Sequence, residues 1–257
     1  MSEHLLLERD EGVLTLRMNR VDKKNALTRA MYAAMAKALD DAAADRSVRV
    51  VLITGGESCF TSGNDVADFL QAPPTGSDSE VFRFMRALFD FPKPVVAAVA
   101  GAAVGIGTTL LLHCDLVYVA EDAQLKMPFV NLGLCPEFGS SMIVPRLLGH
   151  ARAADLLLLG QGFSGADAAR WGIANQALAS GAQALDAAKQ AAKRFLDLAP
   201  QAVIDSKRLM RAPDRELLRQ VIEQEGEVFR QRLSSPEAIE ALQAFMQRRK
   251  PDFSRFA

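Results

Sequence analysis

The sequence predicts an α/β fold that ends in a helical module. In the first half of the chain, short apolar runs alternate with amphipathic segments, as in proteins whose strands are buried between helices. Helical periodicity dominates from Met142 to the C-terminus. The composition changes near Pro200, so we expect a mixed core over residues 1–199 and a helical module over residues 200–257.

The first elements follow from short-range patterns. Two apolar runs, residues 5–8 and 13–18, flank a turn and predict a β-hairpin. Thr28 is a good N-cap for an alanine-rich helix over residues 29–44. Residues 48–54 form a nearly continuous apolar run, which predicts a strand buried on both faces.

The middle of the chain alternates in the same way. Residues 71–79 are rich in proline, glycine and serine and predict a mobile loop. A helix is expected over residues 80–89 and a second buried strand over residues 95–100. A short apolar helix over residues 108–113 and a strand over residues 115–120 complete this part.

The chain from Met142 onward is dominated by helical periodicity. Ser164 and Ser235 are the expected N-caps of two of its helices. The expected helices cover residues 142–148, 151–159, 164–171, 182–198, 201–211, 215–233 and 236–249.

Charge and cysteine content narrow the class of protein. The 30 basic and 31 acidic side chains leave a formal net charge of -1, so nothing indicates a nucleic-acid partner. The three cysteines show no metal-ligand spacing and predict no metal site. We expect a cytoplasmic protein without a membrane partner, because the N-terminus lacks a signal-peptide pattern and no apolar run reaches the ~20 residues of a membrane span.

Two glycine-containing segments could bind an oxyanion. Ser62-Gly63 lets the backbone approach a ligand closely and leaves the N–H of Asn64 free to point into a cavity. Residues 101–107 are rich in glycine and alanine and precede a helix, so the N–H of Ile106 is a second candidate donor. Ordinary turns and close helix–strand packing explain the same patterns equally well.

Glu137 is the candidate general base. It lies between Pro136 and Gly139, on an expected loop that enters the helix over residues 142–148. Its apolar surroundings would raise the pKa of the carboxyl group, which suits proton transfer near neutral pH. The alternative is an acid that only complements the helix dipole. With two N–H donors nearby, the carboxylate could abstract a proton α to a thioester carbonyl.

These residues carry a resemblance to the enoyl-CoA hydratase/isomerase (crotonase) superfamily. Phe-Thr-Ser-Gly-Asn-Asp at residues 60–65 and the glycine-rich run at 100–107, followed by Cys-Asp at 114–115, resemble its two oxyanion motifs. Met-Asn-Arg-Val-Asp-Lys-Lys-Asn-Ala-Leu at 18–27 resembles its opening segment, and residues 163–172 and 245–253 resemble its later motifs. The resemblance implies a crotonase-like ββα spiral core.

Departures from the family pattern indicate a subtype. Thr109 and Phe129 occupy the positions where hydratases carry their two carboxyl groups, so a hydratase is disfavoured. Residues 128–141 closely resemble the second type of Δ3,Δ2-enoyl-CoA isomerase, whose single catalytic glutamate matches Glu137. Phe138 replaces a glycine of that subgroup and would narrow the pocket, and Ala100 replaces an asparagine.

The resemblance therefore implies an isomerase of fatty acid β-oxidation, in which Glu137 moves the proton and the N–H groups of Asn64 and Ile106 form the oxyanion hole. The CoA thioester is the substrate and no cofactor is implied. A homotrimer or a dimer of trimers is implied, with residues 200–257 in the subunit contacts. Residues expected to line the substrate or CoA site are Lys24, Ala26, Ser62, Gly63, Asp65, Val66, Gly105, Phe245 and Lys250.

Two other functions remain open at this point. One is another crotonase reaction on an acyl-CoA, such as hydration, decarboxylation or thioester hydrolysis. The other is acyl-CoA binding without catalysis, because a fold alone does not fix function. Among the remaining polar residues we expect His113 to be structural, Asp65 and Asp115 to be caps or buried acceptors, and Cys114 and Cys135 to be unreactive.

Overall fold

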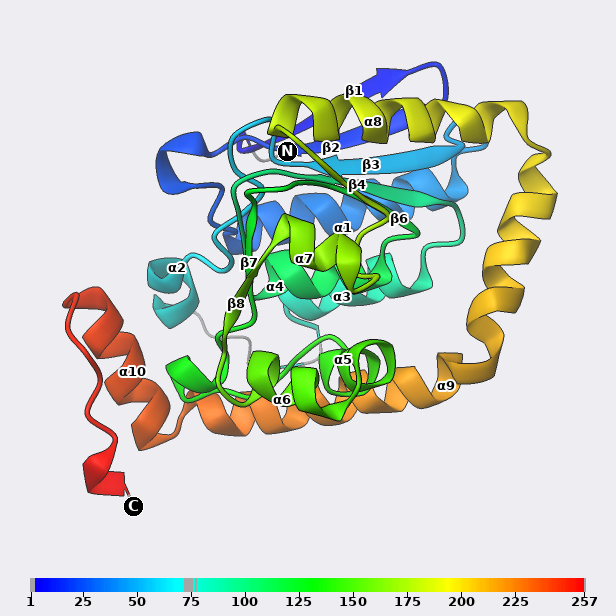
Figure 1. Cartoon of the computed structure of the whole chain (residues 1–257). Coiled ribbons are helices and arrows are strands. Elements are labelled where there is room, and N and C mark those ends of the chain that lie inside the picture. The colour runs from blue at the N-terminus through cyan, green and yellow to red at the C-terminus, as the bar shows by residue number, and fades with distance from the viewer. Residues whose placement is uncertain (1–2, 72–75, 77, 257) are drawn as a thin grey trace.

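The computed structural model describes residues 3–71, 76 and 78–256. The mobile loop predicted over residues 71–79 falls mainly on residues 72–75 and 77, which lie outside the described part. The described residues form the predicted α/β architecture, with one large sheet, one small sheet and helices around both (Figure 1).

The large sheet has six strands in the order β1-β2-β3-β4-β6-β9. The predicted hairpin is confirmed, because β1 and β2 pair antiparallel, and each later pair in this sheet is parallel. The strands are β1 Leu5–Asp10, β2 Val13–Met18, β3 Val50–Thr54, β4 Val95–Val99, β6 Leu116–Ala120 and β9 Gln176–Leu178.

The central strands β3 and β4 are buried on both faces, as their nearly continuous apolar runs predict. Side chains of β3 alternate between two clusters, since successive residues of a strand point to opposite faces. Val51 and Ile53 belong to the main core with α1 Arg29–Ala44 and α3 Glu80–Asp90, whereas Val50 and Leu52 pack with alanines of α8 Gly181–Arg194. Figure 1 shows α8 covering one face of the sheet and α1 and α3 the other.

The small sheet was not predicted. It contains β5 Ala102–Val104, β7 Gln124–Lys126 and β8 Gly162–Ser164, with β7 in the middle. Three residues are too few to establish an alternating pattern, and the glycines on either side of the first strand, Gly101 and Gly105, indicate a turn instead. Strand β5 leads directly into helix α4 Ile106–Thr109, which the 3-10 helix η2 Leu110–His113 continues.

The helices after residue 139 follow the predictions with changed bounds. The helix predicted over residues 182–198 ends at Arg194, and a 3-10 turn over Phe195–Asp197 follows it. The caps are confirmed, because the side chains of Thr28, Ser164 and Ser235 accept N–H bonds. Further helices are α2 Val66–Gln71, α5 Ser140–Leu148, α6 His150–Leu157, α7 Gly165–Arg170 and α10 Pro236–Met246.

Helix α9, Pro200–Leu233, corrects the prediction of two separate helices over residues 201–211 and 215–233. It is continuous through Pro213, and Figure 1 shows that it changes direction partway along its length. Proline removes one helical N–H and crowds the preceding turn, so it bends a helix without always ending it. The bend lets the second half of α9 run beneath the core.

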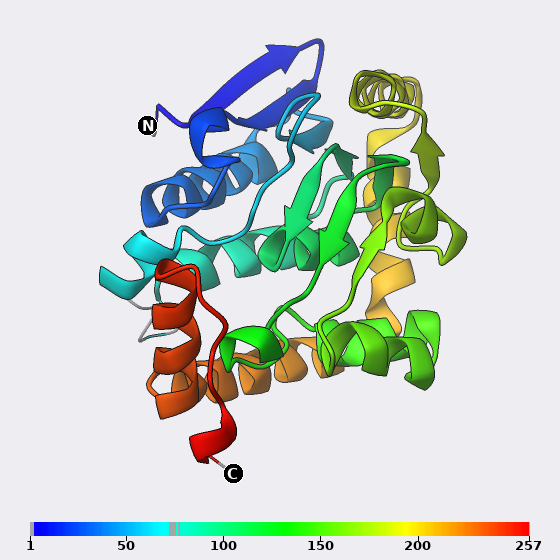
Figure 2. The same cartoon turned by 60° about the vertical axis from the view of Figure 1, so that its left-hand side comes forward.

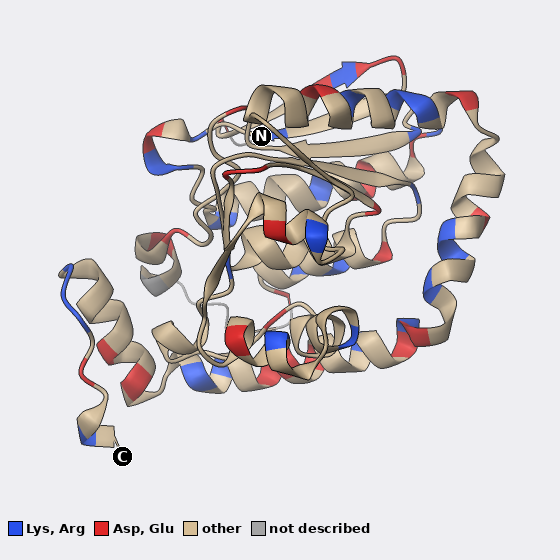
Figure 3. Cartoon of the chain, in the orientation of Figure 1, with Lys and Arg blue, Asp and Glu red and all other residues tan. Residues whose placement is uncertain are grey.

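Helix α10 stands at the end of α9, on the outside of the core (Figure 2). Acidic and basic residues are mixed over the surface helices, whereas strands β3, β4, β6 and β9 of the large sheet contain no charged residue (Figure 3). Among the described residues, no helix has the length and apolar character needed to cross a membrane.

Candidate active site

Two glycines bring the candidate oxyanion segments together. Gly63 has a positive φ of 91°, and a Cβ there would lie 2.8 Å from the backbone oxygen of Val104. A Cβ on Gly107 would lie 2.6 Å from a methyl group of Thr61. The absence of both side chains therefore allows the segments around residues 61–64 and 104–107 to touch.

Backbone pairing orients the N–H of Asn64. The N–H of Leu27 donates to the oxygen of Gly63 at 2.8 Å, and the N–H of Asp65 donates to the oxygen of Leu27 at 2.9 Å. Because N–H groups alternate in direction along an extended chain, the N–H of Asn64 points away from Leu27. Ile106 is the first residue of α4, where an N–H has no partner within the helix. Both groups are thus available to a bound oxygen.

Glu137 is buried, with 6% of its surface exposed, and lies on the loop before α5. Its Oε1 accepts a hydrogen bond of 2.8 Å from the hydroxyl of Thr109. Glu137 and Asn64 line one cavity of about 10 Å³, together with side chains of α2, α3 and α9. The carboxyl group and one candidate oxyanion donor residue therefore face the same enclosed space, which has room for about one water molecule.

Burial sets the acidity of this carboxyl group. It raises the pKa of Glu137 from 4.5 to about 8, the hydrogen bond from Thr109 opposes the rise, and the charge of Glu225 adds to it. At neutral pH the group is therefore poised between its acid and base forms, as a proton carrier requires.

The same shift predicts a stability effect. The folded protein keeps a proton that the unfolded chain loses above its own pKa, so the contribution of Glu137 to stability is full below pH 4.5 and lost as the pH rises toward about 8. We expect Glu137→Gln to be more stable than the wild type at pH 8, by on the order of 1–4 kcal/mol, and to show a smaller difference at pH 5. Thermal unfolding of both proteins across this range measures the effect. A difference that does not grow with pH would contradict it.

Two functional candidates were missed by sequence reasoning. Tyr32 of α1 is buried, and its hydroxyl donates a short hydrogen bond to the side-chain oxygen of Asn64. Burial and the nearby charge of Glu137 raise the pKa of Tyr32, so it remains a neutral donor. Glu225 of α9 is the second, and its carboxylate accepts from two N–H groups of the loop that carries Glu137. No local pattern marks either residue, because both lie on helices far from the loop in sequence.

The predicted substrate-binding residues fall into two groups. Most lie beside the two oxyanion segments: Lys24, Ala26, Ser62, Gly63, Asp65, Val66 and Gly105. Phe245 and Lys250 instead lie at and beyond the end of α10, where both are exposed, and neither lines the cavity at Glu137. Within this one chain the structure does not bring them to the candidate site.

Two aspartates have structural contacts, and a buried histidine and a cysteine have shifted pKa values. Asp65 pairs with Arg20 at 2.6 Å and accepts from the N–H of Asp68 at the start of α2. Asp115 accepts from the N–H of Val95 at 2.8 Å. Burial lowers the pKa of His113 to about 3. It also raises the pKa of the Cys114 thiol to about 12, far above neutral pH.

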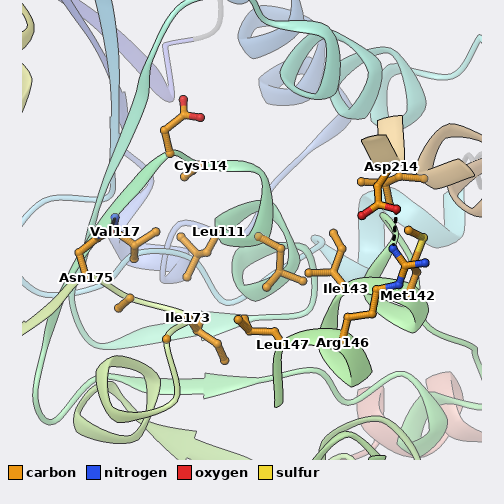
Figure 4. A pocket seen from close by; sticks show the side chains of 15 residues that line it. Leu111, Cys114, Val117, Met142, Ile143, Arg146, Leu147, Ile173, Asn175 and Asp214 are labelled. Carbon is orange, nitrogen blue, oxygen red and sulfur yellow. Dashed lines mark hydrogen bonds and ion pairs between the residues drawn. The ribbon is translucent and has the colours of Figure 1, made fainter. Parts of the chain in front are cut away.

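A larger cavity of about 520 Å³ lies elsewhere, between η2, α5 and the turn at residues 172–175 (Figure 4). Arg146 and Asp214 form an ion pair of 2.8 Å at its rim. Its lining mixes apolar and polar side chains and does not include Glu137, Asn64 or Ile106. Among the described residues, no group of three or more His, Cys, Asp or Glu side chains could hold a metal ion.

The sequence pattern of the Enoyl-CoA hydratase/isomerase family matches residues 8–255. The chain is 34% identical to enoyl-CoA delta isomerase 2 of Rattus norvegicus, over 96% of this chain and 64% of the relative, so it spans less than two thirds of that protein. It is 33% identical to 1,2-epoxyphenylacetyl-CoA isomerase of Escherichia coli K12, over 99% of both chains.

A solved structure of Pseudomonas aeruginosa OdaA is 68% identical and superimposes with a TM-score of 0.94, over 95% of this chain and 99% of that chain. Other relatives are named as a probable enoyl-CoA hydratase or a carnitinyl-CoA dehydratase. The names of these four enzymes agree on CoA esters and differ in the reaction.

Proposed function

This chain belongs to the enoyl-CoA hydratase/isomerase family, and from that premise we propose that it converts 3-enoyl-CoA to trans-2-enoyl-CoA. The CoA thioester is the substrate and the reaction uses no further cofactor. The reaction belongs to fatty acid β-oxidation, in the cytoplasm. The relative named enoyl-CoA delta isomerase 2 supports this reaction. Other relatives are named as a hydratase and a dehydratase, so the reaction needs an experimental test.

The proposed mechanism uses one base. The N–H groups of Asn64 and Ile106 donate to the thioester oxygen, and the carboxylate of Glu137 removes a proton from C2. The electron pair of that C–H bond enters a dienolate, whose negative oxygen the two N–H groups stabilise. The Glu137 carboxyl then returns its proton to C4, which leaves the double bond between C2 and C3.

The observation that carries this proposal is a single buried carboxyl group at the cavity. Glu137 lines the cavity with Asn64, whereas Phe129 is buried and apolar where the resemblance places a hydratase carboxylate. At the other such position, Thr109 donates to Glu137. Glu225 cannot replace the missing base, because both of its oxygens accept backbone N–H bonds. Hydration needs one group to activate the water and a second to protonate the substrate carbon. A site with one carboxyl group therefore fits isomerisation better.

Product analysis tests the proposal. The protein is incubated with 3-enoyl-CoA and, separately, with trans-2-enoyl-CoA, and the products are separated by chromatography. We expect trans-2-enoyl-CoA from the first substrate and no 3-hydroxyacyl-CoA from the second. Formation of 3-hydroxyacyl-CoA as the main product, or of free CoA, would assign another crotonase reaction. Binding of the ester without any product would assign a non-catalytic role.

The C-terminal module supports a second part of the proposal, a homotrimer or a dimer of trimers. Residues 200–257 expose large apolar side chains at Leu209, Met210, Phe245 and Met246, with Met210 83% exposed. Contact with another subunit would cover such side chains. Sedimentation equilibrium distinguishes a trimer or hexamer from a monomer, which would contradict this part.

A further inference from the structure

The turn that carries Glu137 has an unusual backbone. Phe138 has a φ of 56° and Gly139 a φ of 77°, so two consecutive residues adopt the left-handed region. For a bulky residue such as phenylalanine this conformation costs energy and persists only when surrounding contacts enforce it. The position of the Glu137 carboxyl therefore depends on what holds this turn.

His113 holds one side of the turn. Its Nε2 lies 2.7 Å from the backbone oxygen of Phe138, and its ring stacks on the Phe138 ring with centroids 3.7 Å apart. Since burial keeps His113 neutral, its Nε2–H donates this hydrogen bond. This contact fixes the residue after Glu137 from the side of η2.

Glu225 holds the other side. Its Oε2 accepts from the N–H of Gly139 at 2.5 Å, and its Oε1 accepts from the N–H of Ser141 at 2.9 Å. Gly139 is the N-cap of α5 and has no side chain to cap the helix, so α9 supplies the cap from a distance. Only 8% of Glu225 is exposed, which makes these two bonds strongly dependent on its charge.

The carboxylate of Glu225 also interacts electrostatically with the carboxyl group of Glu137 and raises its pKa. The other titratable groups around Glu137 are Tyr32 from α1, His113 from η2 and Cys135 from its own loop, and burial keeps all three neutral near pH 7. Burial raises the pKa of Glu225 as well, but the bonds from Ser141 and Gly139 oppose that rise. The two backbone N–H bonds favour the ionised form of Glu225, and its negative charge opposes the ionisation of Glu137.

We propose that Glu225 is a positioning residue that holds the Phe138–Gly139 turn through two backbone N–H groups and, by its charge, makes Glu137 a stronger base. This inference rests on the proposed function for its effect on turnover. Its effect on the carboxyl group of Glu137 does not depend on any substrate. Glu225 acts through Glu137 and does not itself touch the reacting atoms.

The test compares Glu225→Gln with Glu223→Gln, a matched change at an exposed site on the same helix. Titration of the Glu137 carboxyl is followed by NMR of protein labelled with ¹³C at glutamate carboxyls, and Glu137→Gln identifies its signal. We expect the midpoint near pH 8 in the wild type and in Glu223→Gln, and at least about one pH unit lower in Glu225→Gln. The acid limb of kcat/KM for 3-enoyl-CoA should move by the same amount.

A second variant separates charge from position. Glu225→Asp keeps the charge but is one methylene shorter, so it cannot reach both N–H groups. We expect its titration midpoint to stay close to the wild-type value while kcat falls roughly tenfold or more, because the turn is held less firmly. This variant also keeps the test valid if Glu225→Gln does not fold.

The outcomes are distinct. An unchanged midpoint in Glu225→Gln, or a wild-type kcat in Glu225→Asp, overturns the inference. If the wild type has no isomerase activity but the midpoint moves with Glu225, the proposed function fails and the coupling of the two carboxyl groups stands. If isomerase activity is present and the midpoint does not move, only the role of Glu225 fails.

Discussion

Glu137→Gln should lower kcat for the isomerisation of 3-enoyl-CoA by about 10²–10⁴-fold, the range that a positioned general base contributes. Glutamine has nearly the same shape and can still accept the hydrogen bond from Thr109, so the cavity keeps its form. It cannot take the C2 proton or deliver one to C4. KM should change little, because the carboxyl group is not proposed to bind CoA.

Steady-state kinetics at pH 8 measures this effect, with Glu223→Gln as the control. Near-ultraviolet circular dichroism establishes that the variant is folded. Unchanged turnover in a folded Glu137→Gln protein would mean that another residue is the base, and the proposed mechanism would have to be abandoned.

Gly63→Ala should produce the second large loss. The added Cβ would lie 2.8 Å from the oxygen of Val104, and the φ of 91° is unfavourable for alanine. The backbone must shift to relieve this contact, and the shift should move the N–H of Asn64, the next residue. Loss of one oxyanion donor costs about 10²–10³-fold in kcat in another enzyme, and we expect a loss of this size here.

Gly56→Ala is a matched control for this change. Gly56 has a similar φ of 88°, but no atom lies within 4 Å of the position of its Cβ. Both variants therefore carry the cost of a left-handed alanine, on the order of 1–3 kcal/mol, and only Gly63→Ala meets an obstacle. In Gly63→Ala, both the midpoint temperature of unfolding and kcat should fall. In Gly56→Ala, only the midpoint temperature should fall. Equal activity of the two variants would argue against an oxyanion donor at Asn64.

The large sheet and its flanking helices could be predicted because their apolar patterns are long. Residues 48–54 and 95–100 are apolar runs interrupted only by Arg49 and the terminal Thr54, and the structure forms adjacent parallel strands within them, buried on both faces. The three-residue strands β5, β7, β8 and β9 were missed because so short a segment carries no pattern. The helices predicted over residues 201–211 and 215–233 are one helix, because a proline such as Pro213 can bend a helix without ending it.

The parts of the candidate site that could be predicted are those formed by local turns of the chain. Glycines at 63 and 105 and the proline before Glu137 indicate turns, and the family resemblance shows which turns matter. Tyr32 and Glu225 could not be predicted in the same way. Each reaches the site from a helix, and only the tertiary fold determines that a helical side chain meets a loop far away in sequence.

The central claim is that one carboxyl group carries a proton from C2 to C4. The most direct test uses 3-enoyl-CoA with deuterium at C2, in a single turnover in ordinary water, with the product analysed by NMR. Because Glu137 faces an enclosed cavity of about 10 Å³, exchange with solvent should be slow. The predicted product is trans-2-enoyl-CoA with part of the transferred deuterium at C4. Absence of this isomer, or an isomer with no deuterium at C4, would contradict the claim.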